Sequence, residues 1–175
     1  MQTKKLITGD SIGIVCPSHV ASKERYQKII PTLESLGFNV KLGNNVYKDT
    51  YGYLASEQER ADDFNNMIAD KNVKMILFGG GEGGNELLPY LDYDNIKKHP
   101  KIICGFSDGT TILNSIYALT GLTTYYGQGP GMFFDLRHYD YSQFCAHFVD
   151  DNASDFTANS PWQTLFPGVC KGKLI

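Results

Sequence analysis

Ser107 lies at the centre of GFSDG (residues 105–109), a segment that fits the pattern G-x-S-x-G. A serine in this pattern can act as a nucleophile when a tight turn exposes its hydroxyl and a base accepts its proton. The apolar run at residues 102–104 predicts a strand before the motif, and the apolar spacing within residues 110–119 predicts a helix after it. A nucleophile elbow requires this strand–turn–helix order, in which the glycines relieve crowding between the strand and the helix. The residues alone leave an ordinary glycine-rich turn as the alternative.

A second glycine-rich segment, GGGEGG (residues 79–84), directly follows the apolar run at residues 73–78, which predicts another strand. In a parallel sheet this loop lies at the same carboxyl edge as Ser107, where such sheets bind their ligands. Its exposed amides could then supply an oxyanion donor. A Walker A loop would need a lysine and a hydroxyl residue where this chain has Asn85 and Glu86, so the segment does not predict nucleoside triphosphate binding. A dinucleotide fingerprint and a plain turn remain open as interpretations of the same glycines.

A serine hydroxyl needs a base, and the histidines offer no clear candidate. The chain has four: His19, His99, His138 and His147. None has a spacing that marks it as the partner of Ser107. His138, within FFDLRHYD, is the best of the four, although a solvated loop histidine is the more ordinary interpretation. The sequence therefore predicts a nucleophile without an evident base.

The remaining sequence predicts one α/β domain, with a mainly parallel sheet flanked by helices, because strand and helix patterns alternate along it. Strands are predicted at residues 11–16, 38–42, 73–78, 102–104 and 123–126. Helices are predicted at residues 26–36, 56–68, 85–91, 110–119 and 140–149. Ser56 and Glu59 have the spacing of a capping box, and Pro31 would kink the first helix or mark a late start.

Composition excludes several classes of function. The 175 residues are 42% apolar and 20% charged with a net charge of −3, which is typical of a globular protein. The sequence has no stripe of basic residues that would predict nucleic-acid binding, and it has no apolar run long enough to predict a membrane span. The four cysteines are widely spaced, which predicts neither a zinc site nor another metal site and favours thiols in a reducing cytoplasm. No cofactor is predicted.

The order GDSIGIVCPS, SEQERADDF and GGGEGGNELLPYLDYDNIKKHPKIICGFSDGTTILNSIYALTGLTTYYG resembles the N-terminal domain of the LD-carboxypeptidases, over about residues 7–127. These are serine peptidases, and their family includes immunity hydrolases that inactivate microcin C-type peptide-nucleotide antibiotics. The resemblance implies a class I glutamine-amidotransferase-like (flavodoxin-like) fold with Ser107 as the nucleophile. It also implies an oxyanion hole formed by the backbone N–H groups of Asp108 and Gly81. We expect the neighbouring Gly80 and Glu82 to contact the substrate, a peptide or a peptide-like small molecule.

The same resemblance implies that the catalytic glutamate and histidine come from a C-terminal domain, in the chain order Ser, Glu, His. Residues 1–168 are then the nucleophile-bearing domain, residues 169–175 begin a linker, and these 175 residues alone are expected to be inactive. Cell-wall carboxypeptidases usually carry RGGYG where this chain has residues 79–83, GGGEG, and loss of that arginine and tyrosine favours the immunity-type branch. The alternative is a non-catalytic binding module that retains the fold. Such a module would expose an apolar face and would be expected to form a homodimer or to aggregate.

Overall fold

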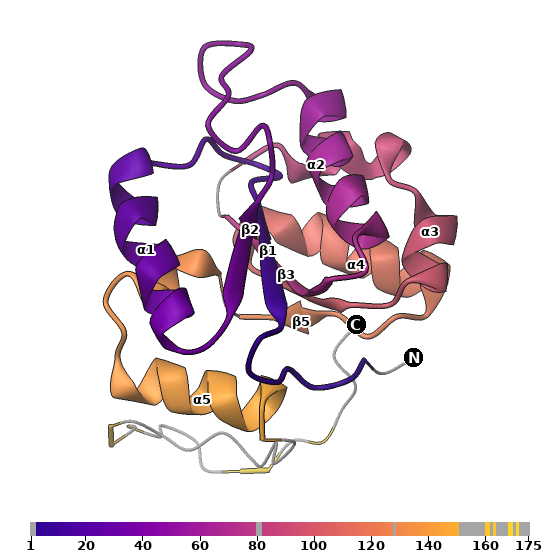
Figure 1. The fold of residues 1–175 in the computed structure, drawn as a ribbon. Coiled ribbons are helices and arrows are strands. Elements are labelled where there is room, and N and C mark those ends of the chain that lie inside the picture. Colours follow the sequence, from indigo (N-terminus) through magenta and orange to yellow (C-terminus); the bar gives the residue numbers. More distant parts are fainter. Residues whose placement is uncertain are drawn as a thin grey trace.

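Strands and helices alternate along the chain in a computed structural model, which describes residues 3–79, 82–127 and 129–150 together with residues 160, 161, 163, 168, 169 and 171 (Figure 1). The elements in chain order are β1 (Ser11–Val15), α1 (Lys23–Ser35), β2 (Asn39–Leu42), α2 (Glu57–Ala69), β3 (Val73–Phe78), the 3₁₀ helix η1 (Gly84–Tyr90), α3 (Tyr93–Lys98), β4 (Ile102–Gly105), η2 (Ser107–Gly109), α4 (Thr110–Thr120), β5 (Tyr125–Tyr126), η3 (Pro130–Phe133) and α5 (His138–Phe148).

The five strands form one parallel sheet in the order β2-β1-β3-β4-β5. The chain moves from β1 outward to β2 and then returns to β3 on the other side of β1. This is the flavodoxin-like order, so the predicted α/β fold is confirmed. Ligands of such sheets bind at the carboxyl ends of the strands where the order reverses, which here is the point between β1 and β3.

Helices cover both faces of the sheet, with α1 and α5 on one face and α2, α3 and α4 on the other (Figure 1). Successive strand residues point to opposite faces and so enter different cores. In β3, Met75 and Leu77 pack with α1 and α5, whereas Ile76 and Phe78 pack with α2 and α4. The sheet is therefore buried on both sides, which leaves its carboxyl edge as the place where side chains can meet a ligand.

The predicted start of a helix is confirmed where local hydrogen bonds determine it. Ser56 and Glu59 form the predicted capping box at the start of α2. The first helix begins at Lys23, after the N-cap Ser22, and continues through Pro31, so of the two alternatives for this proline the late start was wrong. Helix α3 was not predicted, although Asp92 accepts a hydrogen bond from Asn95 and so marks its beginning.

In the part of the chain that the structure describes, no helix has the length and apolarity needed to cross a membrane.

Candidate active site

Ser107 follows β4 by two residues and has the backbone geometry of a nucleophile elbow. Its φ is 55°, and it is the sole non-glycine residue with a positive φ among those described. The left-handed region costs an L-residue roughly 1–3 kcal/mol, so the surrounding structure must hold the serine there. Ser107 is exposed and begins η2, which continues into α4. The strand–turn–helix context that the sequence predicted is confirmed.

The two glycines of the motif make room for Phe78 of the neighbouring strand β3. A Cβ atom on Gly105 would lie 2.6 Å from Cδ2 of Phe78, and one on Gly109 would lie 3.0 Å from the same atom. Phe78 is itself almost fully buried and packs edge-on against Phe64. The crowding that these glycines relieve thus involves a ring beneath the elbow as well as the strand and helix that the sequence indicated.

The carboxylate of Asp108 joins the elbow to the glycine-rich loop. It accepts a hydrogen bond from the backbone N–H of Gly84, and a Cβ atom on Gly84 would lie 3.0 Å from Oδ2 of Asp108. The side chain of Asp108 therefore fixes the end of the loop next to Ser107. That the backbone N–H of Asp108 donates to an oxyanion stays a prediction. Glu82 is exposed in the same loop, whereas Gly80 and Gly81 lie outside the described residues.

Arg60 of α2 connects three segments at this edge of the sheet, and sequence reasoning missed it. The residue is only 3% exposed. Its Nε donates to the carbonyl of Ala55 over 2.9 Å, and its Nη1 donates to the carbonyls of Pro17 and of Gly83, the latter over 3.0 Å. Its Nη2 pairs with the carboxylate of Glu86. Arg60 thus holds the loop after β1 and the glycine-rich loop in a fixed relation.

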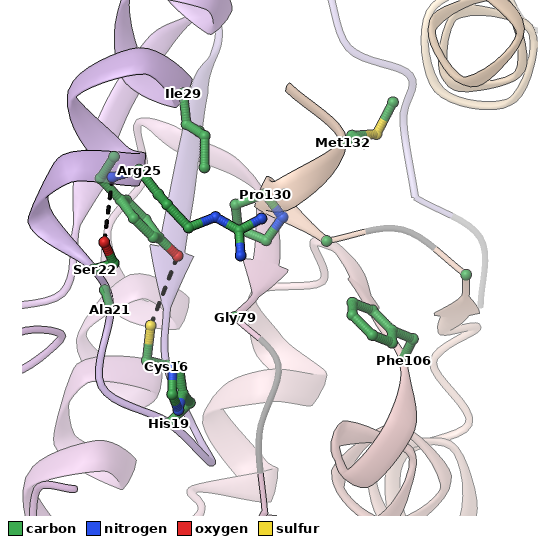
Figure 2. Close-up of a pocket in the computed structure, with 14 residues that line it drawn as sticks. Cys16, His19, Ala21, Ser22, Arg25, Ile29, Gly79, Phe106, Pro130 and Met132 are labelled. Atoms are coloured by element: carbon green, nitrogen blue, oxygen red, sulfur yellow. Dashed lines mark hydrogen bonds between the residues drawn. The ribbon is translucent and has the colours of Figure 1, made fainter. Parts of the chain in front are cut away.

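A cavity of about 440 Å³ opens beside the elbow, at the reversal point between β1 and β3 (Figure 2). Cys16 follows β1 and Gly79 follows β3, while Phe106 directly precedes Ser107. The described residues that line it are Cys16, His19, Ala21, Ser22, Arg25, Tyr26, Ile29, Gly79, Phe106, Gly127, Gly129, Pro130, Gly131 and Met132. The cavity therefore lies where the topology predicts a ligand, and Phe106, the residue before the candidate nucleophile, forms part of its wall, whereas Ser107 itself does not line it.

The floor of the cavity is tightly packed and uncharged. A Cβ atom on Gly79 would lie 2.7 Å from Sγ of Cys16, so a side chain at position 79 would require the thiol to move. Burial raises the pKa of the Cys16 thiol to about 12, and burial likewise raises the pKa of Tyr26, whose hydroxyl lies 3.8 Å from that sulfur. Both groups stay protonated at neutral pH.

The histidine that the sequence favoured as a base, His138, does not line the cavity at the elbow. His138 is the exposed first residue of α5, and His147 contacts the carbonyl of Gln143 within the same helix. His99 lines a different cavity, at the amino ends of β1, β3 and β4, together with lysines such as Lys101. Only His19 lines the cavity at the elbow, and no spacing in the sequence could have shown this, because the fold brings its loop there.

Within the described ranges, no group of three or more histidine, cysteine, aspartate or glutamate residues is arranged to hold a metal ion.

The fold and the site together define a class of protein, a parallel α/β domain that presents an exposed serine on an elbow at the ligand-binding edge of its sheet. The chain belongs to the LD-carboxypeptidase family, because the family model for the LD-carboxypeptidase N-terminal domain matches residues 12–127. The resemblance found in the sequence is thereby confirmed.

Relatives within this family carry two kinds of name. The microcin C7 self-immunity protein MccF of Escherichia coli is 39% identical over 126 residues, which are 70% of this chain and 37% of that protein. A Bacillus subtilis protein named "Probable murein peptide carboxypeptidase" is 33% identical over an alignment 180 residues long, which covers 98% of this chain and 55% of that protein. A solved structure of MccF in complex with aspartyl sulfamoyl adenosine superposes with a TM-score of 0.83 at 32% identity, covering 92% of this chain and 50% of that one. The chain thus spans about half the length, or less, of these relatives.

Proposed function

We propose that this chain is the nucleophile-bearing part of a serine peptidase that hydrolyses an amide bond in a peptide or peptide-like small molecule. The observation that carries the proposal is the left-handed φ of 55° at the exposed Ser107. Strain of this kind persists where the surroundings enforce it, and here Phe78 and the link from Asp108 to Gly84 surround the elbow. Family membership supports the same conclusion, since the matched region includes the elbow.

In the proposed reaction, Oγ of Ser107 attacks the carbonyl carbon of the substrate and its proton passes to a base. The oxygen of the tetrahedral intermediate accepts hydrogen bonds from backbone N–H groups, for which Asp108 and Gly81 are our candidates. The base then gives its proton to the nitrogen of the substrate, and departure of the amine leaves an acyl group on Ser107. Water then attacks this acyl-enzyme and releases the acid.

We assign the base and its orienting acid to a histidine and a glutamate from the C-terminal part of the complete protein. The assignment follows from the family resemblance. Among the described histidines, His138 and His147 belong to α5, His99 lies at the opposite edge of the sheet from Ser107, and His19 lines the cavity beside the elbow. Gly80 and Glu82 remain our candidates for substrate contacts. Both a murein peptide and a microcin-like peptide-nucleotide fit the names of the relatives.

We further propose a cytoplasmic location. Cys16 and Cys145 are thiols and form no disulfide in the described part of the chain, which is the usual state in a reducing compartment.

A fluorophosphonate that forms a covalent adduct with activated serines tests the proposed nucleophile. We expect an adduct on Ser107, located by peptide mass spectrometry, that forms faster in the folded chain than in urea, because the elbow and the oxyanion donors exist only in the folded state. Ser107→Ala removes it, and Ser115→Ala, which changes a serine of α4 that bonds Tyr93, serves as the matched control. Equal labelling in both states would contradict the proposal. Peptide hydrolysis by these 175 residues at ordinary enzyme rates would contradict the assignment of the base to another part of the protein.

A further inference from the structure

The cavity that His99 lines, at the edge of the sheet opposite Ser107, is rich in lysines. Its volume is about 1020 Å³, and it lies where the amino ends of β1, β3 and β4 meet the end of α3. The lysines that line it are Lys4, Lys5, Lys71, Lys74, Lys98 and Lys101. The chain as a whole has a net charge of −3, so this local excess of positive charge runs against the overall balance. A concave site of one sign concentrates ligands of the opposite sign.

Acidic side chains do not neutralise these lysines. None of the ion pairs among the described residues involves a lysine of this cavity. Asp10 is the one carboxylate among the described lining residues, and it accepts a hydrogen bond from the backbone N–H of Ile7, 2.9 Å away. The carboxylate of Asp70, near the cavity, pairs instead with Lys41. The positive charge is therefore available to a ligand.

Lys101 is the buried member of the group. It is 6% exposed, whereas the other lysines of the cavity are exposed. Its Nζ donates to the carbonyls of Asp70 and Val73, each over 2.6 Å, and these neutral acceptors supply no counter-charge. Burial, and then the like charge of Lys74, lowers the pKa of Lys101 from 10.5 to about 8, against the attraction of Asp70. An anion in the cavity would supply the missing counter-charge.

Helix dipoles account for only part of this cluster. Helix α3 ends at Lys98, and α2 ends at Ala69, shortly before Lys71. A lysine near a helix C-terminus interacts favourably with the dipole, which is equivalent to about half an elementary charge at each end. Two such ends balance about one lysine. Lys4 and Lys5 belong to the N-terminal segment and to no helix, so the dipoles leave most of the charge unexplained.

The residue types favour phosphate over carboxylate as the anion. The described lining contains no arginine, whose forked donors match a carboxylate, whereas lysines bind phosphate as separate point charges. The lysines come from three segments, within residues 3–10, 71–74 and 98–101, that surround one concavity. Such an arrangement encloses a compact ligand and does not match a flat surface, and its several charges match a ligand with more than one anionic group.

We propose that this cavity binds a small molecule with at least two phosphate groups, of which pyrophosphate is the minimal form, and that Lys101 contacts a phosphate from the buried side. The site lies at the opposite edge of the sheet from Ser107. The inference therefore goes beyond the proposed function and does not depend on it.

Titration of the ¹⁵N-labelled chain with pyrophosphate at about pH 7 and about 0.1 M NaCl, followed by amide NMR shifts, tests the site. We expect a Kd of about 0.1 mM or lower, with shifts at Lys74, His99 and Lys101 and none at Ser107. Inorganic phosphate is expected to bind at least about tenfold more weakly, because it contacts fewer lysines. Bound pyrophosphate is expected to raise the pKa of Lys101, followed by its side-chain ¹³Cε shift, to about 9 or higher.

Lys98→Gln and Lys97→Gln form a matched pair. Both lysines are exposed in the last turn of α3, but only Lys98 lines the cavity. We expect Lys98→Gln to weaken pyrophosphate binding about three- to tenfold, and Lys97→Gln less than about twofold. Lys101→Met removes the buried cation and is expected to weaken binding about tenfold or more. The matched pair decides the question even if Lys101→Met does not fold.

Equal weakening by Lys97→Gln and Lys98→Gln would refute the site, because net charge alone would then explain the binding. Equal affinity for phosphate and pyrophosphate, or no shifts with pyrophosphate, would refute it as well. Binding that leaves the pKa of Lys101 unchanged would refute the contact given to that residue. If vesicles of phosphatidylglycerol shift the amides of Lys74 and His99 and pyrophosphate does not, the cavity faces a membrane surface and the proposal is wrong.

Discussion

Replacement of Arg60 by methionine is expected to lower the free energy of unfolding by about 3–5 kcal/mol. Methionine fills much of the buried space of the arginine stem but removes its donors. The carbonyls of Ala55, Pro17 and Gly83 then lose their partner, and an unpaired buried acceptor costs about 1–3 kcal/mol. The three costs do not add fully, because the loops can relax toward water. The total is large beside a typical domain stability of about 5–15 kcal/mol.

Glu86→Gln separates the contribution of the three carbonyl contacts of Arg60 from that of its ion pair with Glu86. The side chain of Glu86 is 49% exposed, whereas that of Arg60 is 2% exposed. Water therefore solvates much of the Glu86 carboxylate, and the pair itself is expected to contribute no more than about 1 kcal/mol. Arg60→Lys keeps the charge but not the fork of donors, so it is expected to fall between the two.

Urea unfolding followed by circular dichroism measures all three variants. Hydrogen exchange at the amide of Gly84, the donor to Asp108, reports on the glycine-rich loop directly. We expect Arg60→Lys to speed this exchange and Glu86→Gln to leave it nearly unchanged, a comparison that holds even if Arg60→Met does not fold. A loss in Arg60→Met below about 1 kcal/mol, or an equal loss in Glu86→Gln, would refute the role given to the carbonyl contacts.

Four further predictions concern the elbow and the cavity floor. Ser107→Gly is expected to raise the free energy of unfolding by up to about 1 kcal/mol, because glycine adopts the left-handed φ without strain. Ser107→Ala keeps the strain and is not expected to raise it. Equal urea midpoints for the two variants would contradict the strain at Ser107. Gly105→Ala is expected to lower the free energy of unfolding by about 1–3 kcal/mol in the same assay, and Gly109→Ala by less. The added Cβ atoms would lie 2.6 Å and 3.0 Å from Phe78, respectively. A larger loss for Gly109→Ala would contradict the role given to Phe78. At about pH 8 the thiol of Cys16 is expected to be alkylated on the order of 100-fold or more slower in the folded chain than in urea, because burial raises its pKa from 9.0 to about 12. Since the unfolded thiol ionises first, the stability of wild type relative to Cys16→Ala is fully present below about pH 9 and is expected to fall as the pH rises toward 12.

The parts of the site that one short segment determines could be predicted from the sequence. The elbow needs only a strand, a turn and a helix in order, and GFSDG with its flanks supplies all three. The capping box of α2 is likewise local, because Ser56 and Glu59 bond to each other's backbone within one turn. The flavodoxin-like fold was implied by the family resemblance and not by the strand patterns, which show burial but not which strands are neighbours.

Residues that act across the sheet could not be predicted in this way. Arg60 reaches Pro17 and Gly83, which are 43 and 23 positions away in the chain. In the sequence it is one arginine on the polar side of a helical pattern. Arg25 reaches the cavity only because η3 packs against α1 and places Phe134 beneath its guanidinium. Burial and pairing of long cationic side chains depend on these distant contacts, which no local pattern shows.

The two arginines differ in a way that bears on their roles. Arg60 is buried, and the protein itself occupies its donors on both sides, so its charge organises loops and is not available to a ligand. Arg25 is exposed at a cavity, and one aromatic ring holds it there. A structural cation is satisfied in the free protein, whereas a recognition cation keeps its donors for the ligand. By this criterion Arg60 fixes the loop beside Ser107, so its substitution should lower stability, whereas Arg25 keeps its guanidinium at the cavity.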